Sequence, residues 1–227
     1  ARSLLPIAIV LVAAAVLLSV AGAGIVFINP EERGVVISAI SPKGYREHPL
    51  QPGLNWIVPF LEYVERYPIS RQTYTMSSTP TEGERMTDDS IRARTKDGQE
   101  VYIDCSVIFS VNPERVIDLH ITWQNRYTDE LVRPLVRGLV RDMASQYGVE
   151  EIVSAKRAEL ESRITEELSK KFHDNSLILV DFVLRNIHFT EEYGRAVEQK
   201  QIAQQMALQA RFVVEQKKQE AEQARQI

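Results

Sequence analysis

The hydrophobic and polar positions divide this chain into an apolar first part, a middle part with mixed patterns and a polar last part. Residues 3–30 carry no charged side chain, and residues 4–28 form an apolar run longer than the ~20 residues that cross a ~30 Å hydrocarbon core. The pattern predicts a single-pass transmembrane anchor over residues 1–29. A secretory signal peptide cleaved after Ala23 is the alternative, but the apolar run continues to Ile28, which favours the anchor.

The middle part contains alternating apolar positions that predict β-strands. A short strand is expected within residues 29–38, and residues 54–70 have the pattern of a strand interrupted by a proline. The clearest strand follows the turn dipeptide Asp97-Gly98. Its apolar side chains alternate and share one face: Val101, Ile103, Cys105, Val107, Phe109 and Val111. Residues 77–95 are polar without periodicity, which predicts an exposed connection or a long hairpin tip.

Helical patterns come next along the chain. Residues 127–148 and 149–173 have the apolar spacing of amphipathic helices and are separated by a glycine. Residues 176–189 return to a strand pattern, and Thr190 is a suitable N-cap for a terminal helix. Strands, then helices, then a strand indicate an α+β domain over residues 30–189.

The last part, residues 190–227, predicts one long coiled-coil-type helix that oligomerises. From Ala196 onward it contains no Gly and no Pro and consists almost wholly of strong helix formers. An isolated polar helix is marginal in water, so this helix needs a partner, and identical helices can pack closely through a stripe of mostly small residues. The stripe comprises Ala203, Ala207, Ala210, Val214, Ala221 and Ala224. A solvated single helix is the alternative.

Composition narrows the range of functions. The formal net charge is −4, and no basic stripe with interleaved aromatic residues is present, so a nucleic-acid partner is not expected. Cys105 is the only cysteine, which excludes an internal disulfide, and its place on an alternating strand predicts a buried structural thiol.

Residue types with catalytic chemistry do not form a recognisable motif. The chain has no phosphate-binding glycine-rich loop and no G-x-S-x-G sequence. Four histidines are scattered without metal-ligand spacing: His48, His120, His173 and His188. Ser154 and Lys156 are close enough in sequence for a Ser–Lys dyad, although any polar helix start has such neighbours. We therefore expect no enzyme activity and no catalytic, cofactor-binding or metal-binding residues.

Apolar and aromatic residues gather around Pro59, and two interpretations compete. Amphipathic aromatic side chains suit the headgroup region of a bilayer. The first interpretation therefore assigns membrane contact to Trp56, Ile57, Val58, Phe60 and Leu61. The alternative is that the cluster is a buried strand of the domain core.

Four stretches occur in a familiar order: "EERGVV" just after the apolar run, "PGLNWIVPFLEYVERYPI", "TKDGQEVYIDCSVIFSV" and "FTEEYGRAVEQKQIAQQMALQARFVVEQKKQEAEQAR". Together they resemble the SPFH (Band 7) family, which includes stomatins, prohibitins, flotillins and the bacterial HflK/HflC pair. The last stretch is most similar to prohibitins, so the chain resembles a prokaryotic prohibitin-like protein. The polar run "SSTPTEGERMTDDSIRARTKDG" is longer than the link expected in a prohibitin.

The resemblance implies a scaffold rather than an enzyme. It implies a membrane-anchored protein whose copies assemble into a large ring or cage, organise a membrane microdomain and confine or regulate an FtsH-type membrane protease. It implies an SPFH domain on the extracytoplasmic side of the cell membrane, contact with the lipid bilayer, and no cofactor. A stomatin-like adaptor that binds one membrane enzyme or channel as a small oligomer is the alternative.

Overall fold

The computed structural model describes residues 11, 14–15, 19–20, 22–154 and 156–225, with side chains up to Lys217. Its strands are β1 (Ile25–Ile28), β2 (Glu32–Ser38), β3 (Gly53–Trp56), β4 (Glu62–Pro68), β5 (Gln72–Met76), β6 (Ile91–Arg94), β7 (Glu100–Val111) and β8 (Leu177–Phe189). Its helices are α2 (Val116–Thr122), α3 (Arg133–Ala144), α4 (Val149–Val153), α5 (Arg157–Asp174) and α6 (Glu191–Arg225), with a 3₁₀ turn η1 (Gln124–Arg126) and a π-helical turn η2 (Thr128–Val132). The α+β class is therefore confirmed.

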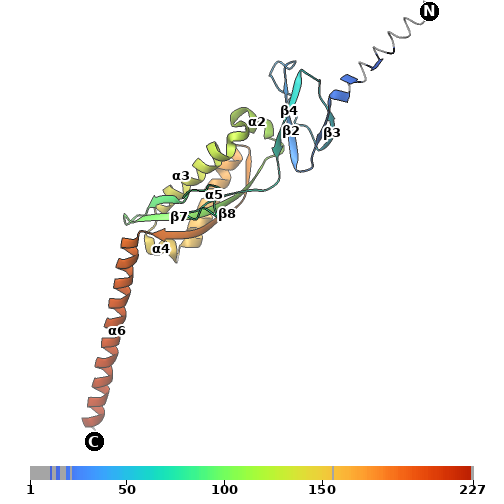
Figure 1. Ribbon diagram of the computed structural model, residues 1–227. Helices are drawn as coiled ribbons and strands as arrows, with labels where there is room; N and C mark the ends of the chain where they lie inside the picture. The colour runs from blue at the N-terminus through green and yellow to red at the C-terminus, as the bar shows by residue number, and fades with distance from the viewer. Residues whose placement is uncertain (1–10, 12–13, 16–18, 21, 155, 226–227) are drawn as a thin grey trace, which may run out of the picture.

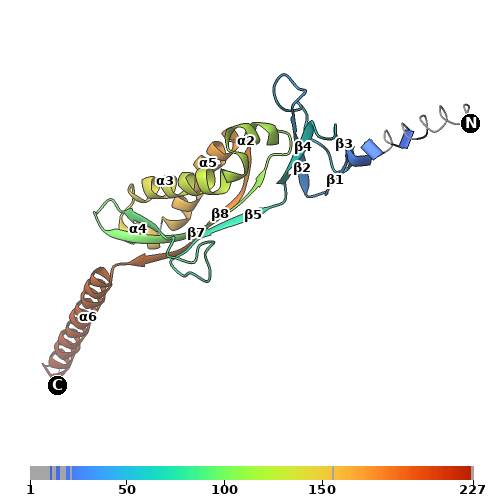
Figure 2. The ribbon, with the colours of Figure 1, turned by 45° about the horizontal axis from the view of Figure 1, so that its top comes forward.

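The main sheet is built around β7. β8 runs antiparallel along one side of β7, whereas β5 and β6 pair with successive parts of the other side. The alternating residues predicted to share a face, from Val101 to Val111, are all buried. Helices α3 and α5 cover the face to which these residues point (Figure 2).

Helix α5 supplies much of the core because its apolar residues recur every four positions. Its fully buried side chains are Leu160, Ile164, Leu168 and Phe172. The ring of Phe172 meets Phe109 of β7 edge to face at 5.9 Å between centroids. The predicted helix over residues 149–173 is in fact two helices, α4 and α5, separated at residues 154–156. Helix α2 was not predicted from the sequence.

A second, smaller unit precedes the main sheet and consists of two antiparallel ribbons, β1/β3 and β2/β4. Its core contains Ile28, Val36, Leu50 and Ile57. Gly34 of β2 is tightly enclosed, since a Cβ there would lie 2.8 Å from a Val64 methyl group. The unit lies between the main sheet and the amino-terminal segment (Figure 1).

The end of the predicted anchor needs correction. Residues 25–28 were assigned to the anchor, but they form β1 and pair with β3. A strand of apolar residues that directly follows an apolar run cannot be separated from it by hydropathy alone. Within the part of the chain that the structure describes, no helix is both long enough and apolar enough to cross a membrane. Most of residues 4–24, where the anchor was predicted, lies outside that part.

The polar segment at residues 77–95 also differs from its prediction. It is not simply an exposed connection, because it includes β6, whose Ile91 and Ala93 are buried. Ser77, Asp89 and Thr95 are buried as well. The segment is therefore folded against the domain, and long-range polar contacts hold it there.

The terminal helix begins where it was predicted. The Thr190 hydroxyl accepts a hydrogen bond of 3.4 Å from the backbone N–H of Tyr193, which caps the first turn of α6. Helix α6 then leaves the domain at the end opposite to the amino-terminal segment (Figures 1 and 2).

Candidate functional site

An apolar patch covers the outward face of the β1/β3 ribbon. The register sets Ile25 opposite Trp56 and Phe27 opposite Leu54. All four side chains are at least half exposed, with Leu54 at 77%. Because cross-strand neighbours lie on the same face, they form one surface. That surface lies at the end of the molecule where the amino-terminal segment leaves the domain (Figure 1).

The turn after β3 extends this patch. Phe60 is 94% exposed and has a backbone φ of 66°, a left-handed conformation that is unfavourable for a bulky side chain. Leu61 beside it is also exposed. A large aromatic side chain held in solvent by a strained turn does nothing for the domain core, so it indicates a binding role.

A buried ion pair shapes the turn that presents Phe60. The Glu62 side chain is only 4% exposed and pairs with Arg46. Glu62 accepts a 2.8 Å hydrogen bond from the backbone N–H of Val58, and Arg46 donates one of 3.2 Å to the carbonyl of Trp56. The hydrogen bond from Arg46 lowers the pKa of Glu62 below its usual value. Both sides of the turn are therefore fixed by charged groups, which preorganises Phe60 and Leu61.

The structure separates the five predicted membrane-contact residues. Trp56, Phe60 and Leu61 are exposed and Val58 is intermediate, whereas Ile57 is only 7% exposed and packs in the small core. Ile57 therefore does not face outward, because successive residues of an extended segment point to opposite faces. The sequence interpretation missed Ile25 and Phe27 as members of this surface, whereas Leu54 belonged to the apolar cluster that it recognised. The alternation of Ile25 and Phe27 is visible in the sequence, but both had been assigned to the anchor.

Helix α6 presents a second surface. Every side chain from Glu198 to Lys217 is exposed. Of the predicted stripe, the structure describes the side chains of Ala203, Ala207, Ala210 and Val214, and all are exposed. For Ala221 and Ala224 only the helical backbone is described.

The apolar side chains of α6 lie on two opposite faces. At 100° per residue, the stripe adjoins larger residues and forms one broad face, which comprises Ile202, Ala203, Met206, Ala207, Ala210, Val213 and Val214. Leu208 and Phe212 form a ridge roughly 170° away from the centre of that face. Phe212 is 73% exposed. A helix with apolar groups on opposite sides is suited to lie between two neighbours.

Three polar residues on the open face of the main sheet resemble a catalytic triad in composition but not in geometry. His188 Nε2 lies 3.0 Å from the buried Asp104 carboxylate and 3.4 Å from the Ser78 hydroxyl. Both oxygens contact the same ring nitrogen. The imidazole therefore does not bridge a carboxylate and a nucleophile through its two nitrogens, as a proton relay requires.

The Ser154–Lys156 pair is also unsuited to catalysis. Lys156 forms an ion pair of 2.7 Å with Glu151, and the hydrogen bond to this carboxylate raises the pKa of the lysine above its usual value. A general base at neutral pH needs the opposite shift. Burial raises the pKa of the Cys105 thiol to about 12, so it is not a reactive thiolate. Among the described residues no group of His, Cys, Asp and Glu could hold a metal ion.

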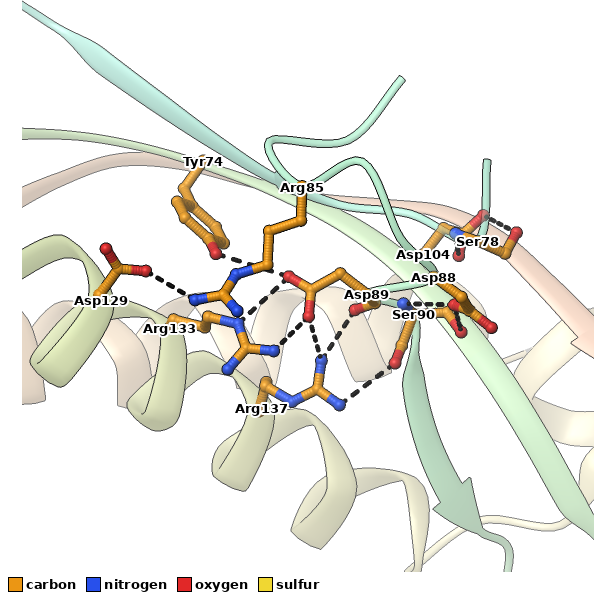
Figure 3. Close-up of polar contacts among 10 residues, drawn as sticks. All are labelled: Tyr74, Ser78, Arg85, Asp88, Asp89, Ser90, Asp104, Asp129, Arg133 and Arg137. Carbon is orange, nitrogen blue, oxygen red and sulfur yellow. Dashed lines mark hydrogen bonds and ion pairs between the residues drawn. The ribbon is translucent and has the colours of Figure 1, made fainter. Parts of the chain in front are cut away.

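A cluster of charged side chains holds the segment before β6 against helix α3 (Figure 3). Asp89, 3% exposed, accepts hydrogen bonds from Arg133 of α3 and, at 3.1 Å, from Arg137 one turn later. Farther out, Arg85 pairs with Asp129 at 3.0 Å. Within the described part of the chain no buried polar side-chain atom lacks a partner, so the cluster is saturated and serves to hold the segment rather than to bind a ligand.

The comparison with protein families gives one match that covers most of the chain. Residues 26–226 match the model described as "SPFH domain / Band 7 family". The match begins within β1 and continues to the end of α6. It therefore includes the α6 surface and all of the β1/β3 patch except Ile25.

The chain is also similar to curated prohibitins. It is 29% identical to "Prohibitin-2" of Mus musculus over 77% of this chain and 54% of that protein. It is 24% identical to "Prohibitin-1" of Colletotrichum higginsianum over 92% of this chain and 70% of that protein. It is 27% identical to "Prohibitin-1" of Saccharomyces cerevisiae over 83% of this chain and 60% of that protein. The chain spans about half the length of several of the relatives it matches.

Proposed function

Since this chain belongs to the SPFH domain / Band 7 family and is prohibitin-like, we propose that it is a membrane-anchored scaffold whose copies assemble laterally into a large ring or cage. The assembly encloses a patch of bilayer and organises the lipids and proteins within it. No covalent chemistry is part of this role.

The observation that carries the proposal is helix α6. It exposes apolar residues on two opposite faces, and every side chain from Gln201 to Lys217 is exposed. At its base, Gln201 and Gln204 line a groove together with residues of α4. Exposed apolar side chains on a long, ordered helix indicate a partner. A second copy fits best, because the bulky ridge of Leu208 and Phe212 on one helix complements the small residues Ala203 and Ala207 on the next.

Such contacts repeat around a closed ring. Each helix uses one face toward one neighbour and the opposite face toward the other, which is a head-to-tail interface that closes if the rotation per copy divides a full turn. A weak contact becomes stable there because all the copies are tethered to one membrane and their effective concentration is high.

The membrane attachment has two parts in this proposal. Residues 4–24 remain as an uncharged run of 21 residues after β1 is removed from the predicted anchor, still about the ~20 residues that span a bilayer. The patch formed by Ile25, Phe27, Leu54, Trp56 and Phe60 lies beside this run and would enter the headgroup region of the same bilayer. The domain lies on the extracytoplasmic side, as the resemblance to HflK/HflC implies.

The proposed client is a membrane protease of the FtsH type, held inside the enclosed patch. The second candidate function is a stomatin-like adaptor that binds one membrane enzyme or channel. The exposed apolar patch of the small unit favours neither. The length of α6 favours the enclosing scaffold, since an adaptor needs no exposed two-faced helix of 35 residues.

The test changes only the small-residue face of α6. Ala207→Glu with Ala210→Glu places two bulky charges in every contact, which costs a few kcal/mol per boundary. We expect mass photometry of the detergent-extracted full chain to show the large assembly reduced to small species, with the circular dichroism of the domain unchanged. Gln205→Glu with Gln209→Glu is the matched control, because both positions lie between the two apolar faces. An unaltered assembly in the first variant would refute the proposed contact.

A further inference from the structure

Exposed edges of a β-sheet promote aggregation when many copies of a protein are concentrated at one place. Backbone N–H and C=O groups at an edge can pair with a strand of another molecule. The main sheet has three strands with an outer side, because β5 and β6 both lie on one side of β7 and β8 lies on the other. At each of these edges, other groups of the same chain form hydrogen bonds with some of the backbone groups.

Two side chains of helix α5 cover the edge of β8. Arg157 donates hydrogen bonds of 2.7 and 2.6 Å to the carbonyls of Leu184 and Arg185. Glu161 accepts one of 3.1 Å from the backbone N–H of Leu184. Arg157 and Glu161 thus supply the donor and the acceptor that a neighbouring strand would offer.

The register of β8 adds to this protection. β8 has an extra residue opposite β7 between Leu184 and Ile187 and another between Leu179 and Asp181. Such β-bulges twist an edge and interrupt its pairing. One of them lies directly beside the residues that Arg157 contacts. The longest outer edge of the sheet is therefore irregular at two places and covered at Leu184 and Arg185.

Helix α3 contacts the backbone of β6 and of the two residues before it. Arg137 donates hydrogen bonds of 2.8 and 3.3 Å to the carbonyls of Asp89 and Ser90, which directly precede β6. One turn later, Arg141 donates one of 3.3 Å to the carbonyl of Arg92. β6 itself has only four residues, and a short edge strand is a poor template for pairing.

The segment before β6 covers the edge of β5. The N–H of Glu84 donates a 3.0 Å hydrogen bond to the carbonyl of Thr75, and the N–H of Asp89 donates one of 3.0 Å to the carbonyl of Ser77. The Asp89 carboxylate holds the segment in place through Arg133 and Arg137 (Figure 3). This gives a role to the polar run that is longer than expected in a prohibitin.

We infer that Arg157, Glu161, Arg137, Arg141 and the segment of residues 77–90 seal the main sheet against strand addition by other copies. The charged side chains of α3 and α5 form hydrogen bonds that the backbone of a neighbouring strand would otherwise form. The sheets of crowded copies therefore do not pair edge to edge. The inference that these groups protect the sheet edges does not depend on the proposed function. One consequence rests on that function: in the assembly, the copies must meet through surfaces other than the sheet edges.

The experiment removes the seal at β8. Arg157→Leu with Glu161→Leu is made in the full chain that also carries Ala207→Glu and Ala210→Glu, which removes the proposed α6 contact, and association is measured relative to the same chain without the β8 changes. The matched control is Arg163→Leu with Glu167→Leu, which removes the same two charges from α5 at exposed positions that do not contact β8. Hydrogen exchange at the Leu184 amide and mass photometry over a concentration series are the measurements.

We expect the Leu184 amide of the unsealed variant to exchange roughly tenfold faster, as the loss of a charge-assisted hydrogen bond implies. We also expect this variant, and not the control, to self-associate as its concentration rises. Glu161→Gln should behave as wild type, because an amide oxygen still accepts from Leu184. If the double variant does not fold, Glu161→Ala removes the acceptor alone. Equal association of variant and control, or faster exchange without association, would overturn the inference.

Discussion

At the scale of a single residue, Phe60 lowers the stability of the fold and adds an exposed aromatic side chain to the surface. Its left-handed backbone is unfavourable for a phenylalanine, and its side chain gains nothing from the core because it is almost fully exposed. The buried Arg46–Glu62 pair holds the turn in spite of this strain. In the proposed function, this strained and exposed apolar residue contacts the lipid surface.

Phe60→Gly separates stability from membrane contact. Glycine adopts a positive φ without a steric penalty, so the variant should be as stable as wild type or more stable by about 1 kcal/mol. Its binding to phospholipid vesicles should weaken, because the exposed ring is lost. The comparison uses a chain that begins at Ile25, which keeps β1 and omits the predicted anchor. Chemical denaturation and vesicle sedimentation give the two values. Unchanged vesicle binding would contradict a lipid role for Phe60.

At the scale of elements, a side-chain hydrogen bond between β4 and α2 helps to link the two units of the domain. The hydroxyl of Tyr67 in β4 and Nδ1 of His120 in α2 share a hydrogen bond of 2.6 Å, in which the hydroxyl is the donor when the imidazole is neutral with its proton on Nε2. Burial lowers the pKa of His120 below its usual value of 6.5, although the charge of Glu65 opposes this shift. Tyr127 also packs against Tyr67, with 6.4 Å between ring centroids. Because burial disfavours the charged imidazole, protonation of His120 costs stability at the contact between β4 and α2.

This junction predicts a pH dependence with a definite sign. Because the folded-state pKa is depressed, the unfolded chain takes up the proton first as the pH falls below about 6.5. The contribution of His120 to stability is therefore full above that pH and is lost toward the lower, folded-state pKa. Denaturation at a series of pH values should show a smaller acid loss in His120→Gln, which accepts from Tyr67 without titrating. Parallel curves for the two proteins would refute the assignment.

The elements also show what sequence patterns can and cannot predict. The alternation along β7 and the four-residue spacing in α5 arise from local burial on one face, so the sequence alone revealed both. β1 was misassigned because its pairing with β3 joins residues about 28 positions apart. The segment at residues 77–90 was expected to be exposed, since its attachment depends on Arg133 and Arg137, far along the chain. Contacts of this range leave no periodic signal.

The candidate surfaces were predictable to different degrees. The apolar cluster around Phe60 and the stripe on α6 could both be read from residue types and spacing. The opposite ridge of Leu208 and Phe212 was not identified, although the helical period contains it. The inward position of Ile57 and the arginine contacts to the sheet edges required the three-dimensional structure.

At the scale of the whole molecule, the two apolar surfaces lie at opposite ends (Figure 1). The patch on the β1/β3 ribbon is next to the amino-terminal segment, and α6 leaves from the far side of the main sheet. With 35 residues, α6 is roughly 50 Å long at 1.5 Å per residue. Copies anchored side by side would therefore place their helices away from the bilayer, where they can form the wall of a cage.

Electron-microscopy images of the detergent-extracted, full-length wild-type protein would show whether its copies enclose a patch of bilayer. An enclosing scaffold predicts closed rings or cages of uniform diameter, with a wall of elongated, laterally packed density on the side away from the detergent belt. Particles limited to monomers or small open oligomers would contradict the enclosing scaffold and support the adaptor instead.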